Sequence, residues 1–134
     1  SKSRGSSRGS SGCAAQAAGA MEGRLDDDQL QAIYTWVDQV PLSRPKRNIA
    51  RDFSDGVLFA EIVHHYHPRL VDLHNYSAAN GLKQKTYNWE TLQKKTLRRL
   101  KLVVTPDEIQ AVAAGQQHQI ERLLLRLKTR LAAY

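Results

Sequence analysis

Basic side chains gather in two parts of this chain, and their chemistry is the binding of anions. One group lies in RPKRNIAR at 44–51, and the other in residues 83–101, where seven cations accompany a single acid, Glu90. Such side chains attract acidic surfaces, and salt weakens the attraction. We predict that both groups belong to one docking surface with these members: Arg44, Lys46, Arg47, Arg51, Lys83, Lys85, Lys94, Lys95, Arg98, Arg99 and Lys101.

Charge runs usually face water, so a solvated loop or helix face is the alternative interpretation of each group. Pro41 and Pro45 stiffen the first group, so ordering it on a partner costs less entropy. Like charges four residues apart on a helix repel by about 0.2–0.5 kcal/mol per pair. The second group contains two such pairs, Lys94/Arg98 and Lys95/Arg99. An acidic partner that covers these cations would explain their presence.

Other chemistries find little support in the residues. Four histidines lie near one another in the sequence: His64, His65, His67 and His74. Their spacing is not that of a zinc helix, and the lone Cys13 is distant. Asp52 and Asp55 are interpreted as caps of a following helix. Without a phosphate loop, a nucleophile motif or paired catalytic carboxylates, we expect no enzyme, no metal and no cofactor.

Composition favours one folded domain with acidic partners. The 134 residues are 41% hydrophobic and suffice for one core. No apolar run approaches the length of a membrane span, and no secretory signal is apparent. The net charge is +7. Three of those charges lie in the first 20 residues, which lack acids. The basic C-terminal segment RLLLRLKTRL is assigned to the core, with a membrane-surface helix as the alternative.

Hydrophobic periodicity predicts an all-α domain. We expect helices over 26–40, 54–66, 88–100, from Thr105 to about Gly115, and over 117–132, with a loop at 68–84. The helix at 54–66 is apolar over most of its circumference, which is typical of a central helix. Trp36 falls off its helix's apolar stripe and is expected to pack against a loop. Residues 1–24 are Ser-, Gly- and Ala-rich and predict a disordered or extended leader, either a tag or a native basic arm.

The central segment DFSDGVLFAEIVHHYHP resembles the calponin-homology domain. That family's core helix opens with an Asp-x-x-Asp-Gly turn, here Asp52, Asp55 and Gly56, and Asn88–Trp89 resembles its later helix entry. The resemblance covers residues 25–132 and is strongest toward a sperm flagellar branch of the family. It implies a single calponin-homology-like helical domain at 25–132.

The resemblance also implies a function. Members of this branch bind microtubules in motile cilia and flagella, notably at the central apparatus of the axoneme, and help to stabilise or bundle them. We therefore expect a non-enzymatic cytoskeletal protein in the cytoplasm and cilium, with tubulin and other axonemal proteins as partners. Full-length members dimerise through a coiled-coil tail, and no such heptads occur here.

Actin binding is the alternative function, because many calponin-homology proteins bind actin. High-affinity actin binding in the family usually uses two tandem domains, whereas this chain has room for one. Nucleic-acid binding is a third possibility, restricted to phosphate contacts because base-reading side chains beside aromatics are missing. We expect neither nucleic acid nor membrane as a partner.

Overall fold

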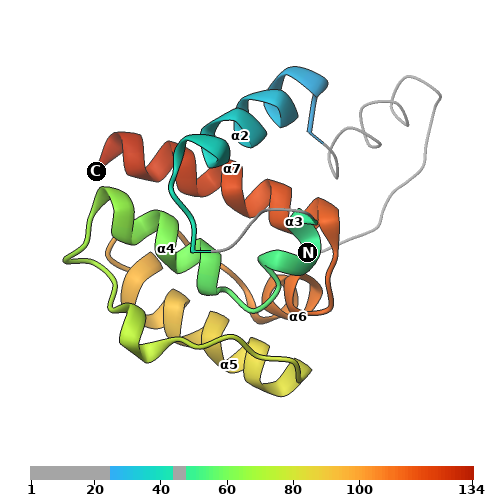
Figure 1. Ribbon diagram of the computed structural model, residues 1–134, viewed down its shortest axis with the longest axis vertical. Coiled ribbons are helices and arrows are strands. Elements are labelled where there is room, and N and C mark those ends of the chain that lie inside the picture. The colour runs from blue at the N-terminus through green and yellow to red at the C-terminus, as the bar shows by residue number, and fades with distance from the viewer. Residues whose placement is uncertain (1–24, 44–47) are drawn as a thin grey trace.

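The computed structural model describes residues 25–43 and 48–134, and every regular element within those ranges is a helix (Figure 1). This confirms the predicted all-α class, whereas the predicted leader at 1–24 lies outside the described residues. The elements are α2 (Asp27–Gln39), α3 (Ile49–Asp52), α4 (Val57–Tyr66), the 3₁₀ turn η1 (Leu73–Asn75), α5 (Leu82–Thr91), the π-helical η2 (Leu92–Leu97), α6 (Pro106–Ala113) and α7 (Gln117–Ala133).

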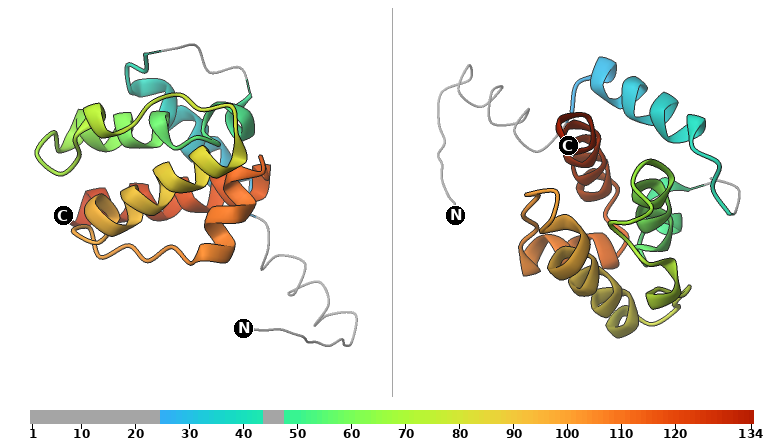
Figure 2. Two further views of the ribbon diagram at one scale, coloured as in Figure 1. Left: turned by 90° about the horizontal axis from the view of Figure 1, so that it is seen from below. Right: turned by 90° about the vertical axis from the view of Figure 1, so that its left-hand side faces the viewer.

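The C-terminal helix α7 runs through the middle of the fold and contacts α2, α3, α4 and α6. Figure 2 shows α2 on one side of α7, with α5 and η2 on the other. The wide apolar surface predicted for the 54–66 segment is confirmed, since five residues of α4 are buried: Leu58, Phe59, Ala60, Ile62 and Val63. They pack in one core with the buried leucines of α7, Leu123, Leu124 and Leu127.

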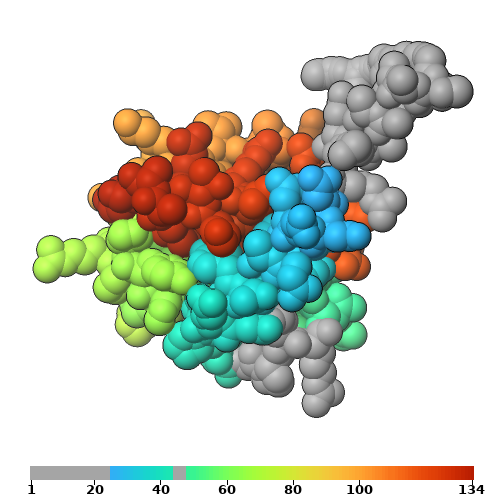
Figure 3. Space-filling model, turned by 90° about the horizontal axis from the view of Figure 1, so that it is seen from above, coloured from blue at the N-terminus to red at the C-terminus, as the bar shows by residue number. Residues whose placement is uncertain are grey.

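Helix α2 forms where local signals predict it. Asp26 and Gln29 form a capping box at its start, and Pro41 follows its end. Figure 3 shows α2 lying beside α7 at the surface. The expected loop contact of Trp36 is wrong, because its ring stacks on Tyr66 at the end of α4 with 6.1 Å between ring centroids.

The turn before α4 differs from the prediction. Helix α4 begins at Val57 rather than at residue 54, because Gly56 has a left-handed backbone with φ of +78°. Asp55 caps it as predicted, since its Oδ1 accepts a hydrogen bond of 3.1 Å from the Val57 N–H. Asp52 does not cap α4. Its Oδ2 accepts a hydrogen bond of 3.1 Å from the Asn48 N–H, at the start of the short helix α3. The sequence predicts no helix here, and residues 41–51 are interpreted as a connector between two helices.

Helix α5 begins six residues earlier than predicted, so the loop predicted at 68–84 is shorter and contains η1. Asn88 and Trp89 are therefore mid-helix residues and not a helix entry. Both are buried against the turn before α4. The Trp89 Nε1–H donates to the Ser54 carbonyl at 2.8 Å, and the Asn88 amide donates to the Asp55 and Ser77 carbonyls at 3.0 Å each. These bonds tie α5 to the base of α4.

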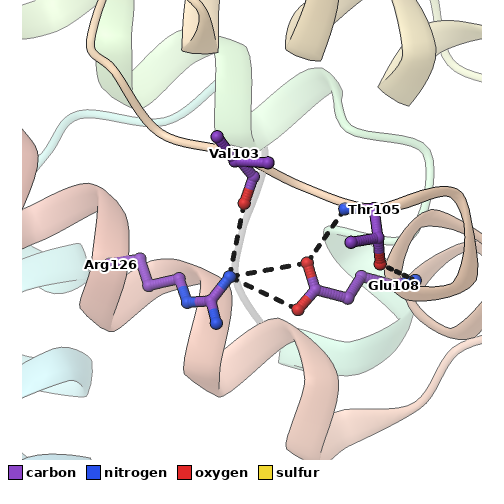
Figure 4. A network of polar contacts seen from close by, with 4 residues as sticks. All are labelled: Val103, Thr105, Glu108 and Arg126. Carbon is purple, nitrogen blue, oxygen red and sulfur yellow. Dashed lines mark hydrogen bonds and ion pairs between the residues drawn. The ribbon is translucent and has the colours of Figure 1, made fainter. Parts of the chain in front are cut away.

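Helix α6 begins where the sequence predicts a helix, directly after Thr105. Thr105 and Glu108 form a capping box around Pro106. The Arg126 side chain of α7 donates to a Glu108 carboxylate oxygen at 3.3 Å and to the Val103 carbonyl at 3.3 Å (Figure 4). This contact joins α7 to the segment that leads into α6.

Candidate anion-binding surface

A groove of about 1080 Å³ opens between η2 and the segment at 68–76 that follows α4. We call it the basic groove. Among the described residues, four of its cations come from η2 and the turn that follows it, and the fifth comes from the facing segment. These five cations are Arg69, Lys94, Lys95, Arg98 and Arg99.

A π-helical turn lies where the four cations share one side. The Arg98 N–H donates to the Gln93 carbonyl at 3.1 Å, five residues back, which is the π-helical pattern. A π-turn holds more residues than an α-turn, so residues four and five apart lie above one another. Thr96 and Leu97 point inward and are buried, which leaves the charged residues on the outer side. All four of those side chains are exposed.

The opposite wall of the groove is held in place by polar contacts, one of them buried. The Thr96 hydroxyl donates to the Leu70 carbonyl at 3.3 Å, which attaches the 68–76 segment to η2. Asp72 begins η1 by accepting a hydrogen bond of 3.0 Å from the His74 N–H. Burial raises the pKa of the Tyr76 phenol, while a hydrogen bond with Thr96 opposes that rise. These contacts fix the position of the 68–76 segment against η2.

Positive charges outnumber negative charges among the described residues of the basic groove. None of its five cations forms an ion pair with another described residue. Asp72 is the single acid among the described residues that line it, and His64 and His74 contribute further nitrogen groups. Clustered cations of one sign raise the local concentration of anions. The groove is thus suited to an anionic partner.

Most of the first predicted basic group lies outside the described residues, namely Arg44, Lys46 and Arg47. Arg51 is exposed on α3, and among the described residues it forms no ion pair. The described ends of this connector are anchored. The Ser43 N–H and hydroxyl both donate to the Glu61 carboxylate of α4, at 2.8 and 2.6 Å. The Asn48 side chain accepts from the Arg51 N–H at 3.2 Å.

The exposed stripe of α4 links the connector to the basic groove. Glu61 holds Ser43, and His64, three residues later, lines the groove. Residues three apart on a helix lie on the same face. The described end of the connector at Ser43 therefore lies on the same side of α4 as the groove residue His64.

Three predicted members of the surface lie away from the groove. Lys83 borders a separate hollow on α5, beside Gln110 of α6. Lys85 is half-buried on α5 and does not line the groove. Lys101 lines a further hollow with Arg130, and its φ of +60° places it in the left-handed region at the end of the π-containing helix.

Arg69 is the groove cation that sequence reasoning missed. It stands alone in a loop, without a charged neighbour in the sequence, so no local pattern marks it. His74 had been considered only for metal binding. Within the ranges 25–43 and 48–134, no three His, Cys, Asp or Glu side chains are placed to share a metal ion. Over the same ranges, no helix has the length and apolar character needed to cross a membrane.

Comparison with known proteins agrees with the family resemblance. The family described as "CH-like domain in sperm protein" matches residues 33–129. Similar proteins named sperm flagellar protein 1 occur in Bos taurus and Homo sapiens, each 46% identical over 111 residues, which is 83% of this chain and 47% of the relative. The Xenopus laevis protein of that name is 48% identical over 107 residues, 80% of this chain and 47% of the relative. The chain thus spans about half the length of these curated relatives.

Proposed function

Because this chain belongs to the family of CH-like domains in sperm proteins, we propose that it is a non-enzymatic module that binds the microtubules of a flagellar axoneme. The names of its relatives support a flagellar, cytoskeletal role. The observation that carries the proposal is the basic groove, with five cations that form no ion pair among the described residues. In the full-length protein, this domain would contribute to stabilising or bundling microtubules at the central apparatus, with dimerisation through another segment.

Charge complementarity supplies the mechanism. The tubulin lattice is acidic, and its subunits carry glutamate-rich tails. The connector presents its cations from anchored ends, at Ser43 on one side and Asn48 on the other. An anchored loop loses less entropy on binding than a free one. Attraction between the two surfaces speeds encounter and weakens as salt screens it.

The first test is co-sedimentation of the whole chain with microtubules, actin filaments and DNA in parallel, over a series of salt concentrations. The proposal expects sedimentation with microtubules that falls strongly from low to moderate salt. Sedimentation with actin alone would favour the alternative function. Microtubule binding that does not change with salt would contradict the electrostatic mechanism.

The second test uses charge reversal in the connector. Arg47→Glu or Arg51→Glu should weaken microtubule binding without lowering the melting temperature, because reversal adds repulsion to lost attraction. Arg130→Glu, an exposed reversal on α7, is the matched control and should have a smaller effect. If Arg51→Glu alone lowers stability, Arg51 has a structural role. If both connector variants are folded and sediment like the parent, the connector is only a solvated loop.

A further inference from the structure

The basic groove is open at the surface, which suits an extended partner better than a small enclosed ligand. It has a volume of about 1080 Å³, and its cations stand on two walls, Arg69 on one and Lys94, Lys95, Arg98 and Arg99 on the other. The cations are exposed at the surface and do not enclose a small cavity. Small-molecule pockets, by contrast, bury most of their ligand and are mostly apolar.

The spacing of the cations matches an extended acidic peptide. Side chains four residues apart on a helix have Cβ atoms about 5–6 Å apart. Side chains on the same side of an extended strand repeat at about 6.6–6.8 Å, twice the rise per residue. Lys94 and Arg98 are four residues apart. Every second glutamate of an extended segment could therefore face one of these two cations. Arg69 would meet the intervening residues from the other wall.

We propose that the basic groove binds a glutamate-rich, extended peptide segment, the acidic tail of a tubulin subunit. This inference rests on the proposed function and assigns separate tasks to the two basic groups. The groove takes the flexible tail, and the connector meets the folded lattice. The tail is disordered before binding, so it pays ordering entropy when it binds, and each contact with an exposed cation contributes modestly. Binding of the tail alone is weak and sensitive to salt.

Asp72 offers a gain-of-affinity test. Its carboxylate is the one acid among the described residues lining the groove, and its Oδ1 also starts η1. Asn at this position keeps an acceptor oxygen for the His74 N–H and removes the negative charge. Asp72→Asn should therefore strengthen binding of an acidic peptide, by about twofold for one exposed charge. Misfolding does not produce such a gain.

The experiment uses the whole chain and a fluorescently labelled oligo-glutamate peptide, followed by fluorescence anisotropy at low salt without microtubules. The parent should bind, and the double variant Arg98→Glu/Arg99→Glu should bind roughly tenfold more weakly, because reversal at two sites replaces attraction with repulsion. The double variant Arg122→Glu/Arg130→Glu on α7 makes the same change of charge outside the groove, and it should change affinity less than twofold. Unchanged peptide binding by the groove double variant would overturn the inference, as would a gain for that variant or a loss for Asp72→Asn.

Co-sedimentation with intact microtubules and with microtubules whose tails a protease has removed separates this inference from the proposed function. The inference expects trimming to weaken sedimentation of the parent and to leave that of the groove double variant nearly unchanged. If the parent sediments equally with trimmed and intact microtubules, the tail assignment fails and the microtubule function stands. If the peptide binds in the groove but microtubules do not sediment the parent, the proposed function fails and the groove stands as an acidic-peptide site. Displacement of the peptide by short duplex DNA at far lower concentration would overturn the choice of a peptide as occupant.

Discussion

Replacing Gly56 with alanine tests how the turn before α4 is built. Gly56 has a φ of +78°, and a Cβ atom there would lie 3.1 Å from Leu92 Cδ1 and 3.3 Å from Trp89 Cε2. Two costs therefore add. The left-handed backbone costs a residue with a Cβ about 1–2 kcal/mol, and overpacking in a dense core costs about 1–3 kcal/mol. We expect Gly56→Ala to lower the free energy of unfolding by about 2–5 kcal/mol.

Two other glycines separate these costs. Gly115 has a φ of +94°, and its Cβ would meet nothing within 4 Å, so Gly115→Ala should cost only the backbone term of about 1–2 kcal/mol. Gly81 precedes α5 with a φ of −83° and equally open space. Gly81→Ala should change stability by less than about 0.5 kcal/mol, as surface substitutions usually do.

Urea unfolding of the three variants and the parent, followed by circular dichroism, measures the differences directly. In a domain of this size, each 1 kcal/mol also corresponds to about 4–8 °C in melting temperature. The reasoning requires Gly56→Ala to lose clearly more stability than Gly115→Ala. If the two variants lose the same amount, the close approach of Leu92 and Trp89 to the turn contributes nothing, and the packing argument is refuted.

Three further outcomes are expected. Arg126→Ala should cost about 0.5–1.5 kcal/mol in urea unfolding, because it removes partly exposed hydrogen bonds to Glu108 and a backbone carbonyl; no loss would make this contact incidental. Burial, followed by a hydrogen bond to a buried glutamate, raises the pKa of the Tyr34 phenol, so folding stability should fall as pH rises above about 10, where unfolded tyrosine ionises. Tyr34→Phe should reduce that slope in a pH series, and an identical slope would contradict the assignment. Glu61→Ala should release Ser43 and weaken microtubule co-sedimentation severalfold while the helical spectrum is kept; parental binding would show that the anchor is dispensable.

Signals that act within a few residues were enough to predict several helices. The helix starts near Asp26 and at Thr105–Pro106 and the break at Gly115 stand close to where the sequence predicts them. Caps and apolar stripes depend only on neighbours within one or two helical turns. The segment at 82–87 carries no such stripe, since Asn88 and Trp89 are the buried residues of α5. Its helical start was therefore missed.

In the candidate site, too, the sequence marked some residues and only the structure placed others. The sequence by itself determined that the chain is basic, all-helical and related to CH-like domains, and it marked Lys94, Lys95, Arg98 and Arg99 as one cluster. Only the tertiary structure decided that Arg69 stands opposite this cluster and that Lys83 and Lys101 lie elsewhere. The hydrogen bond that attaches the two walls joins Thr96 to Leu70 across 26 residues. Such pairings follow from how distant buried residues pack together, and no local pattern of residue types encodes them.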